Sequence, residues 1–289
     1  MSLNRLSLIV LYSAGLLLVG AVLVKGVHYY TAPLELRPHS PLHQFLKPSG
    51  KWGHGLGILG SSMMLLLFLY SVRKRQKLGL RFGKIRHWLN IHIFFGVMGP
   101  IFVTLHTSFK FGGIVVVSYY SMIAVMLSGF IGRYLYVQIP RALSGDELTL
   151  RQMDEQNTVL TKSLAEDYRL SENILNEIKK LSLVNENQTR KGLSLLFYVF
   201  VNDLIRPFKI RQIRRNILSQ RNIPMEKADH VLELIREKSL LMRKMSLLSS
   251  IKPLFHYWHV AHKPFAYVMI IIMFIHVAVT ILFGYRWIF

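Results

Sequence analysis

Five long runs of apolar residues alternate with polar segments along the chain, at 6–27, 53–72, 89–108, 114–139 and 264–283. Each run is close to the roughly 20 residues that an α-helix needs to cross the hydrocarbon core of a bilayer. Pro140 follows the fourth run and is expected to help end its helix. The first run lacks an obvious signal-peptide cleavage site, so we expect a retained helix. The pattern predicts an all-α membrane protein with about five transmembrane helices.

A polar segment, 141–252, separates the fourth and fifth runs. Amphipathic helical patterns cover 146–183 and 225–249. Between them lies a short apolar stretch, 193–205, which is followed by basic residues and therefore suggests a helix on the membrane surface. We expect three parts: transmembrane helices 1–4 (1–140), a helical cytoplasmic insert (141–252) and transmembrane helix 5 (253–289). The insert has no recognisable catalytic motif, so we interpret it as a docking platform.

The charge is strongly basic, with 36 Lys and Arg against 15 Asp and Glu and a formal net charge of +21. The basic residues crowd beside the apolar runs, which favours anionic lipids over nucleic acid as partners. Between the second and third runs no acid interrupts the basic residues Arg73, Lys74, Arg75, Lys77, Arg81, Lys84 and Arg86. The positive-inside rule then places this loop and the N-terminus in the cytoplasm and the C-terminus outside.

The chain has no cysteine. Disulfides, Cys-ligated iron–sulfur clusters and covalently attached haem are therefore excluded. The sequence also lacks a convincing Gly-rich nucleotide loop. If electrons pass through this chain, their donor and acceptor lie elsewhere.

Four histidines lie inside or at the ends of two of the apolar runs. His92 and His106 belong to the third helix, and His262 and His276 to the fifth, so both pairs are 14 residues apart. Fourteen residues make almost four helical turns, which places each pair on one side of its helix, about 21 Å apart. The two helices are expected to run in the same direction, with His92 facing His262 and His106 facing His276. A low-spin haem takes two axial nitrogens, so the pattern predicts two b-type haems within the helix bundle and the four histidines as their iron ligands.

Other residues are candidates for contact with the cofactors. Gly96 and Gly99 lie between the histidines of the third run, where a flat porphyrin needs close backbone, although small residues also serve helix packing. Arg133 suits a haem propionate or the lipid headgroups. His54 is a candidate alternative ligand, a propionate partner or part of a quinone pocket.

The sequence resembles the haem domain of ferric reductases and NADPH oxidases, and it also resembles respiratory cytochrome b. The features that carry the resemblance are the paired histidines, the turn at 109–113 and the segments 128–136 and 258–264. A bacterial group of five-helix, cytochrome b-like membrane proteins is the nearest likeness. The resemblance covers 53–139 and 255–285. It implies electron relay between a quinone pool or cytoplasmic flavoprotein and a cytochrome or iron–sulfur partner.

We therefore predict a dihaem cytochrome b subunit of a bacterial inner-membrane redox complex, an electron-transfer component of an oxidoreductase and not a self-contained enzyme. A quinone is a further candidate cofactor, and a flavoprotein, an iron–sulfur protein or cytochrome c are the candidate partners. Two alternatives remain open. One is a haem-free anchor or scaffold subunit. The other is a metal-ion transporter, although such a protein more often has carboxylates or broken helices at the midplane, and these runs contain no Asp or Glu.

Overall fold

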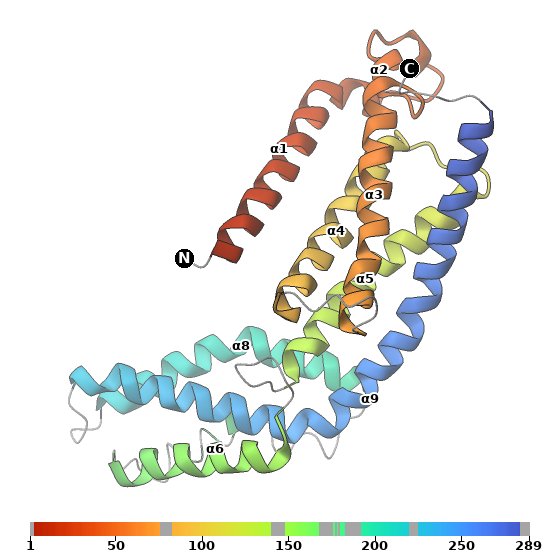
Figure 1. The fold of residues 1–289 in the computed structure, drawn as a ribbon. Helices are drawn as coiled ribbons and strands as arrows, with labels where there is room; N and C mark the ends of the chain where they lie inside the picture. The colour runs from red at the N-terminus through yellow and green to blue at the C-terminus, as the bar shows by residue number, and fades with distance from the viewer. Residues whose placement is uncertain are drawn as a thin grey trace. The chain divides into compact units, whose positions relative to one another are not determined.

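The computed structural model of the chain, drawn in Figure 1, describes residues 3–75, 83–139, 148–167, 176, 178, 180–182, 192–219 and 225–283. These residues form helices joined by turns, and no β-strand occurs among them. The predicted all-α fold class is therefore confirmed. Lys77, Arg81, Pro140 and part of the amphipathic segment 146–183, which the sequence analysis used, lie outside the described residues.

The described elements have the following bounds: α1 (Leu3–Thr31), the 3-10 turn η1 (Arg37–His39), α2 (His43–Leu46), α3 (Lys51–Lys74), α4 (Ile85–His106), α5 (Val115–Gln138), α6 (Leu150–Lys162), the π-helical turn η3 (Ser163–Asp167), α8 (Gly192–Ser219) and α9 (Met225–Leu282).

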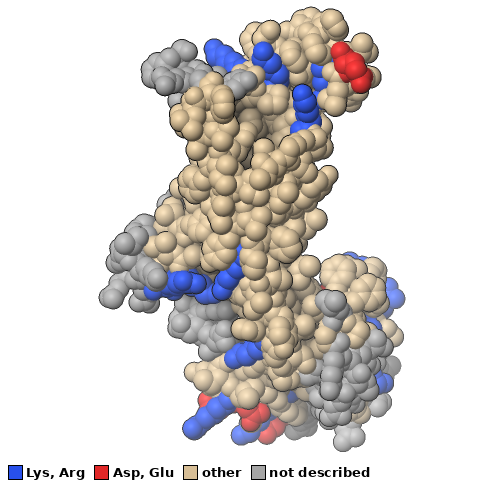
Figure 2. All heavy atoms as spheres, turned by 90° about the vertical axis from the view of Figure 1, so that its right-hand side faces the viewer, with Lys and Arg blue, Asp and Glu red and all other residues tan. Residues whose placement is uncertain are grey.

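Among the described residues, five segments are long and apolar enough to cross a membrane: Leu6–Thr31, His43–Lys74, Ile85–His106, Val115–Gln138 and Asp229–Leu282. Each overlaps one of the five predicted apolar runs. On the face that Figure 2 presents, the apolar spans form a broad belt without charged side chains. The chain is thus a multi-pass membrane protein, as predicted.

The helices divide into two compact units, Met1–Ile131 with His259–Phe289, and Gly132–Trp258. Both α5 and α9 continue through the boundary between the units. The predicted divisions after residues 140 and 252 separate transmembrane from cytoplasmic segments, and they stay predictions. Leu135 and Ile139 of α5, which belong to an apolar run, are buried in the core of the second unit.

In the first unit, α3 contributes to two hydrophobic clusters. Leu56 packs in a cluster formed mainly by α1 and α4. Met64 and Leu67 pack with α5 and with Met269 of α9, and the hydroxyl of Ser118 on α5 donates to the carbonyl oxygen of Met269 at 2.9 Å. Consequently, α3 packs on the helix that carries His92 and His106 and shares a hydrophobic cluster with the helix that carries His262 and His276.

A buried arginine fixes the end of α4, just after His106. The Arg37 side chain donates to the carbonyl oxygens of Ala32, Tyr30 and Ser108. The hydroxyl of Ser108 donates to the carbonyl oxygen of Leu46 at 2.6 Å. Ser108 itself has a positive φ of 48°, a conformation that costs energy for a non-glycine residue and persists only where its surroundings hold it.

The second unit combines the end of α5 with α6, α8 and the first part of α9. Its core contains the largely or fully buried residues Leu135, Met153, Leu195, Leu247 and Ile251. A capping box, in which Thr149 and Gln152 each bond the other's backbone, begins α6.

Two helices are longer than the sequence predicted. The amphipathic segment 225–249 and the span at 264–283 belong to one continuous helix, α9, which includes Pro253 and Pro264. The predicted surface helix at 193–205 is the first half of α8, which continues through Pro207. Proline lacks a backbone donor and usually interrupts a helix, but neighbouring groups can compensate for the lost bond.

Candidate functional site

His92 and His106 of α4 both bond to backbone carbonyls of α3. The Nδ1 atom of His92 lies 3.2 Å from the carbonyl oxygen of Leu67. The Nδ1 atom of His106 lies 2.8 Å from the carbonyl oxygen of Gly53. A carbonyl oxygen only accepts, so Nδ1 is the donor in both rings. In a neutral imidazole, Nε2 then keeps its lone pair, which is the arrangement of a metal-ligating histidine whose other nitrogen is held by the protein.

His262 of α9 has the same arrangement with a serine as its partner. Its Nδ1 atom lies 2.7 Å from the hydroxyl oxygen of Ser128 on α5. That hydroxyl also lies 2.9 Å from the carbonyl oxygen of Val125, which can only accept. When the hydroxyl donates to Val125, it accepts from the ring, and Nε2 of His262 keeps its lone pair.

The members of each predicted histidine pair lie near one another in the structure. His92 is close enough to His262 for a charge on one ring to affect the other, and the same holds for His106 and His276. His54, expected at the same level, is similarly near both His106 and His276. Figure 1 shows α4 and the last part of α9 running in the same direction, as the alternation of spans predicted. All four rings of the two pairs are half-buried.

In the part of the chain that the structure describes, no three His, Cys, Asp or Glu side chains are grouped so that they could chelate one metal ion. A haem iron already has four porphyrin nitrogens and needs from the protein only two axial ligands. The donor set, two histidines at each level, fits a haem better than a metal ion held by protein ligands alone.

Gly57 allows the His106 ring to lie against α3. A Cβ atom at this position would be 2.6 Å from Nδ1 of His106 and 2.8 Å from its Cε1 atom. Any larger residue would therefore displace the ring or the helix. The missing side chains at the Gly-rich start of α3 leave room for the His106 ring to reach the carbonyl oxygen of Gly53.

The glycines predicted to face the porphyrin have different surroundings. A Cβ at Gly99 would be 2.9 Å from the sulfur of Met64 and 3.4 Å from the carbonyl oxygen of Gly60, so close packing of α3 on α4 accounts for it. At Gly96 the nearest atom, on Leu67, is 3.8 Å away. A Cβ at Gly129, next to Ser128, would meet no described atom within 4 Å.

Arg133 belongs to the second unit, where its guanidinium lies 5.7 Å from the ring centre of Tyr136. Its predicted role beside a haem propionate stays a prediction. The roles proposed for His54 also stay predictions, although its neighbours His106 and His276 are the expected ones.

Sequence reasoning identified the four histidines but missed the groups that orient three of them. Ser128 was noted only as part of a resembling segment, and a single serine in an apolar run is a weak signal. The carbonyl oxygens of Leu67 and Gly53 have no side-chain signature. Gly53, Gly55, Gly57 and Gly60 at the start of α3 are a sequence feature typical of close helix packing.

Comparison with known protein families, characterised proteins and solved structures finds no match. The class that the fold defines is therefore a helical protein with five candidate membrane-spanning helices. The likeness to dihaem cytochromes remains an interpretation of the histidine pattern.

Proposed function

We propose that the chain is a dihaem b-type cytochrome subunit, which relays electrons across a membrane between redox partners. The observation that supports this most strongly is the common arrangement of His92, His106 and His262. Each ring donates through Nδ1 to a fixed acceptor, which leaves Nε2 as a ligand. Structural histidines in a bundle need no such shared tautomer, whereas axial ligands do.

In this proposal, His92 and His262 hold one haem, and His106 and His276 hold the other. One-electron oxidation and reduction of the iron is the chemistry that the group supplies when bound. The chain orients the ligands through Ser128 and two carbonyl oxygens, and the apolar runs around them contain no Asp or Glu. Histidines and polar groups within spans are expensive, and they typically mark a functional path.

The remaining parts of the proposal concern orientation and partners. Arg73, Lys74 and Arg75 at the end of α3 favour a cytoplasmic location for that end. The His92 level then faces the cytoplasm, and the His106 level faces the outside of a bacterial inner membrane. A flavoprotein, an iron–sulfur protein or cytochrome c would exchange electrons with the two levels, and a quinone is a candidate reactant near His54.

The test is an optical spectrum of the purified protein, oxidised and then reduced with dithionite, together with a pyridine haemochrome assay. Two haems per chain are expected. His92→Ala or His262→Ala should remove one haem, and His106→Ala or His276→Ala the other. The exposed His39→Ala is the matched control and should retain both.

A haem content near zero in protein made with sufficient haem would reject the proposal and favour the scaffold alternative. Loss of a haem in His259→Ala, with both retained in His262→Ala, would reject the ligand assignment on α9.

A further inference from the structure

Among the described residues, helix α8 has two apolar sides, one buried and one largely exposed, although Phe200 on the exposed side also contacts the ring of Tyr134. Leu195, Val199, Ile210 and Ile213 are buried in the second unit. On the other side, Phe197, Phe200, Leu204 and Phe208 have exposed fractions of 71%, 48%, 60% and 66%. These four positions recur every three or four residues and therefore line one side of the helix, which we call the aromatic stripe.

Basic residues continue the aromatic stripe at the C-terminal half of α8. Arg211 and Arg215 follow Phe208 at the same helical spacing, and both are exposed. The guanidinium of Arg211 lies 5.7 Å from the ring centre of Phe208. Exposed aromatic residues beside arginines are typical of helices that lie in the headgroup region of a bilayer.

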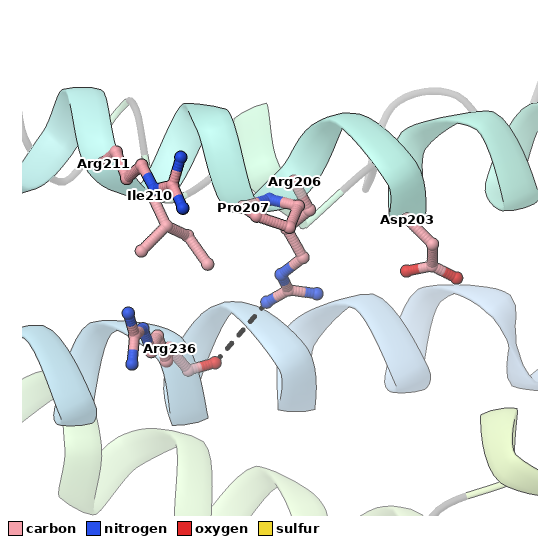
Figure 3. Close-up of a pocket in the computed structure, with 6 residues that line it drawn as sticks. All are labelled: Asp203, Arg206, Pro207, Ile210, Arg211 and Arg236. Atoms are coloured by element: carbon pink, nitrogen blue, oxygen red, sulfur yellow. Dashed lines mark hydrogen bonds between the residues drawn. The ribbon is translucent and has the colours of Figure 1, made fainter.

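A pocket of about 320 Å³ adjoins the stripe, and Figure 3 shows its lining. Arg206, Ile210 and Arg211 come from α8 and Arg236 from α9; Asp203 and Pro207 complete the wall. In Figure 3 the Arg206 side chain extends from α8 toward α9, and the dashed line marks its bond to the backbone oxygen of Arg236 at 3.5 Å. The same Nη2 atom also donates to the hydroxyl of Ser239 at 2.6 Å.

Arg206 has unused capacity for an anion. Only 9% of the residue is exposed, and its Nη1 atom has no hydrogen-bond partner. Burial, followed by the nearby charge of Arg243, lowers the pKa of Arg206 to about 10, so the side chain is still a cation at neutral pH. A buried cation with an unpaired N–H is costly, and an anionic ligand would remove that cost.

The one carboxylate in this pocket is already engaged. Asp203 accepts from both terminal nitrogens of Arg243, from the hydroxyl of Tyr134 at 2.7 Å and from the side-chain amide of Gln138 at 3.3 Å. Three arginines thus line a pocket whose one acid among the described residues pairs with a fourth arginine. Arg211 and Arg236 also line a neighbouring pocket with Asp229 and Glu233. The electrostatic complement of this pocket is a phosphate-like anion.

We propose that α8 binds anionic phospholipids, with the aromatic stripe among the upper acyl chains and the headgroup phosphate at Arg206, Arg211 and Arg236. Chain connectivity supports a lipid partner, because the second unit begins within α5 and ends within α9, and both helices are candidate spans. The unit is therefore tethered at the membrane whatever its other contacts. A phosphate alone would leave the stripe uncovered, whereas a lipid satisfies both features.

The absence of cysteine makes the stripe directly testable. A nitroxide is attached to full-length Leu204→Cys in bilayers of phosphatidylcholine with phosphatidylglycerol, and its accessibility to oxygen and to a polar nickel chelate is measured. Lys209→Cys, exposed and five residues or about 140° around α8 from Leu204, is the matched control. We expect Leu204→Cys to be oxygen-accessible and chelate-protected, and Lys209→Cys to show the reverse. Equal chelate accessibility at the two positions would overturn the proposal.

The pocket is tested by counting bound phosphatidylglycerol on the full-length protein by native mass spectrometry. Arg211→Gln and Arg236→Gln should each weaken binding by about fivefold, the ratio that corresponds to ~1 kcal/mol per basic residue. Arg211→Lys should retain most of the binding. Phosphatidylglycerol binding that is unchanged in both Gln variants would overturn the assignment. If inorganic phosphate bound at the pocket while Leu204→Cys stayed chelate-accessible, the ligand would be a soluble phosphate and the lipid proposal would fail.

Discussion

Replacing Asp203 with Asn tests the buried ion pair that supports the second unit. Asp203 pairs with Arg243, whose side chain is only 2% exposed, while the Asp203 side chain is 30% exposed. Removing one partner leaves a buried cation without compensation, which typically costs about 3–5 kcal/mol. Because Asp203 is partly exposed, we expect the lower end of this range, about 3 kcal/mol. In a chain of this size that corresponds to a melting temperature lower by about 6–12 °C.

The pH dependence gives an independent signature. Burial by itself raises the pKa of Asp203, but hydrogen bonds from Arg243 and Tyr134 and the nearby charges of Arg243 and Arg206 outweigh it, so the pKa lies below its ordinary value. A carboxylate with a lowered folded-state pKa contributes stability above its unfolded pKa, roughly 3.9, and loses it as the pH falls through the folded value. The difference between wild type and Asp203→Asn should therefore be constant from about pH 5 to 8 and shrink below about pH 4.

The assay is thermal unfolding of the purified full-length protein in detergent, followed by circular dichroism across this pH range. Asp229→Asn is the matched control, since Asp229 pairs with Arg214 at 2.9 Å but both side chains are mostly exposed, at 77% and 51%. Such a pair contributes about 0–1 kcal/mol. If Asp203→Asn melted within a degree or two of Asp229→Asn, the reasoning about the buried pair would be refuted.

Two further predictions concern the histidines. Ser128→Ala removes the acceptor for Nδ1 of His262. Loss of such a supporting group lowers the affinity for bound metal about 10–100-fold. Haem titration of Ser128→Ala should therefore show weaker binding, and Ser128→Thr should largely restore it. Equal haem affinity in Ser128→Ala would contradict this. Gly57→Ala places a Cβ 2.6 Å from Nδ1 of His106, and such overpacking costs about 1–3 kcal/mol. The melting temperature of Gly57→Ala should therefore fall. Gly20→Ala, with no atom within 4 Å of its Cβ, is the control and should leave the melting temperature unchanged. Equal melting temperatures in the two variants would contradict the close packing of the His106 ring on Gly57.

The features of the sequence that recur along the chain predicted the fold well. The five apolar runs correspond to the five candidate spans. The free energy gained when about 20 apolar residues leave water for lipid is larger than the helix or turn preferences of single residues. The equal spacing of His92 to His106 and of His262 to His276 gave the two levels at which the structure brings histidines together. Periodicity carries this information because helix geometry is regular.

Interactions between distant residues could not be predicted in the same way. Ser128 and His262 are 134 residues apart, and Asp203 and Arg243 are 40 apart. Nothing in their local sequence indicates the contact. Hydropathy also cannot tell whether an apolar residue faces lipid or the core of a neighbouring unit. For this reason the predicted boundary after residue 140 gave no sign that Leu135 packs in the core of the second unit.

Two leucines on α5 test that boundary directly. Leu135 is 1% exposed and packs in the core of the second unit, whereas Leu127 is 55% exposed on the part of α5 that belongs to the first unit. Truncating a buried leucine to alanine costs about 2–5 kcal/mol because it loses apolar contacts and leaves a cavity. Truncating a lipid-facing leucine leaves no cavity. Leu135→Ala should therefore speed hydrogen exchange in α6 and α8, and Leu127→Ala should leave exchange in these helices unchanged. Similar exchange in the two variants would mean that Leu135 does not stabilise the second unit. That result would favour the predicted division after residue 140.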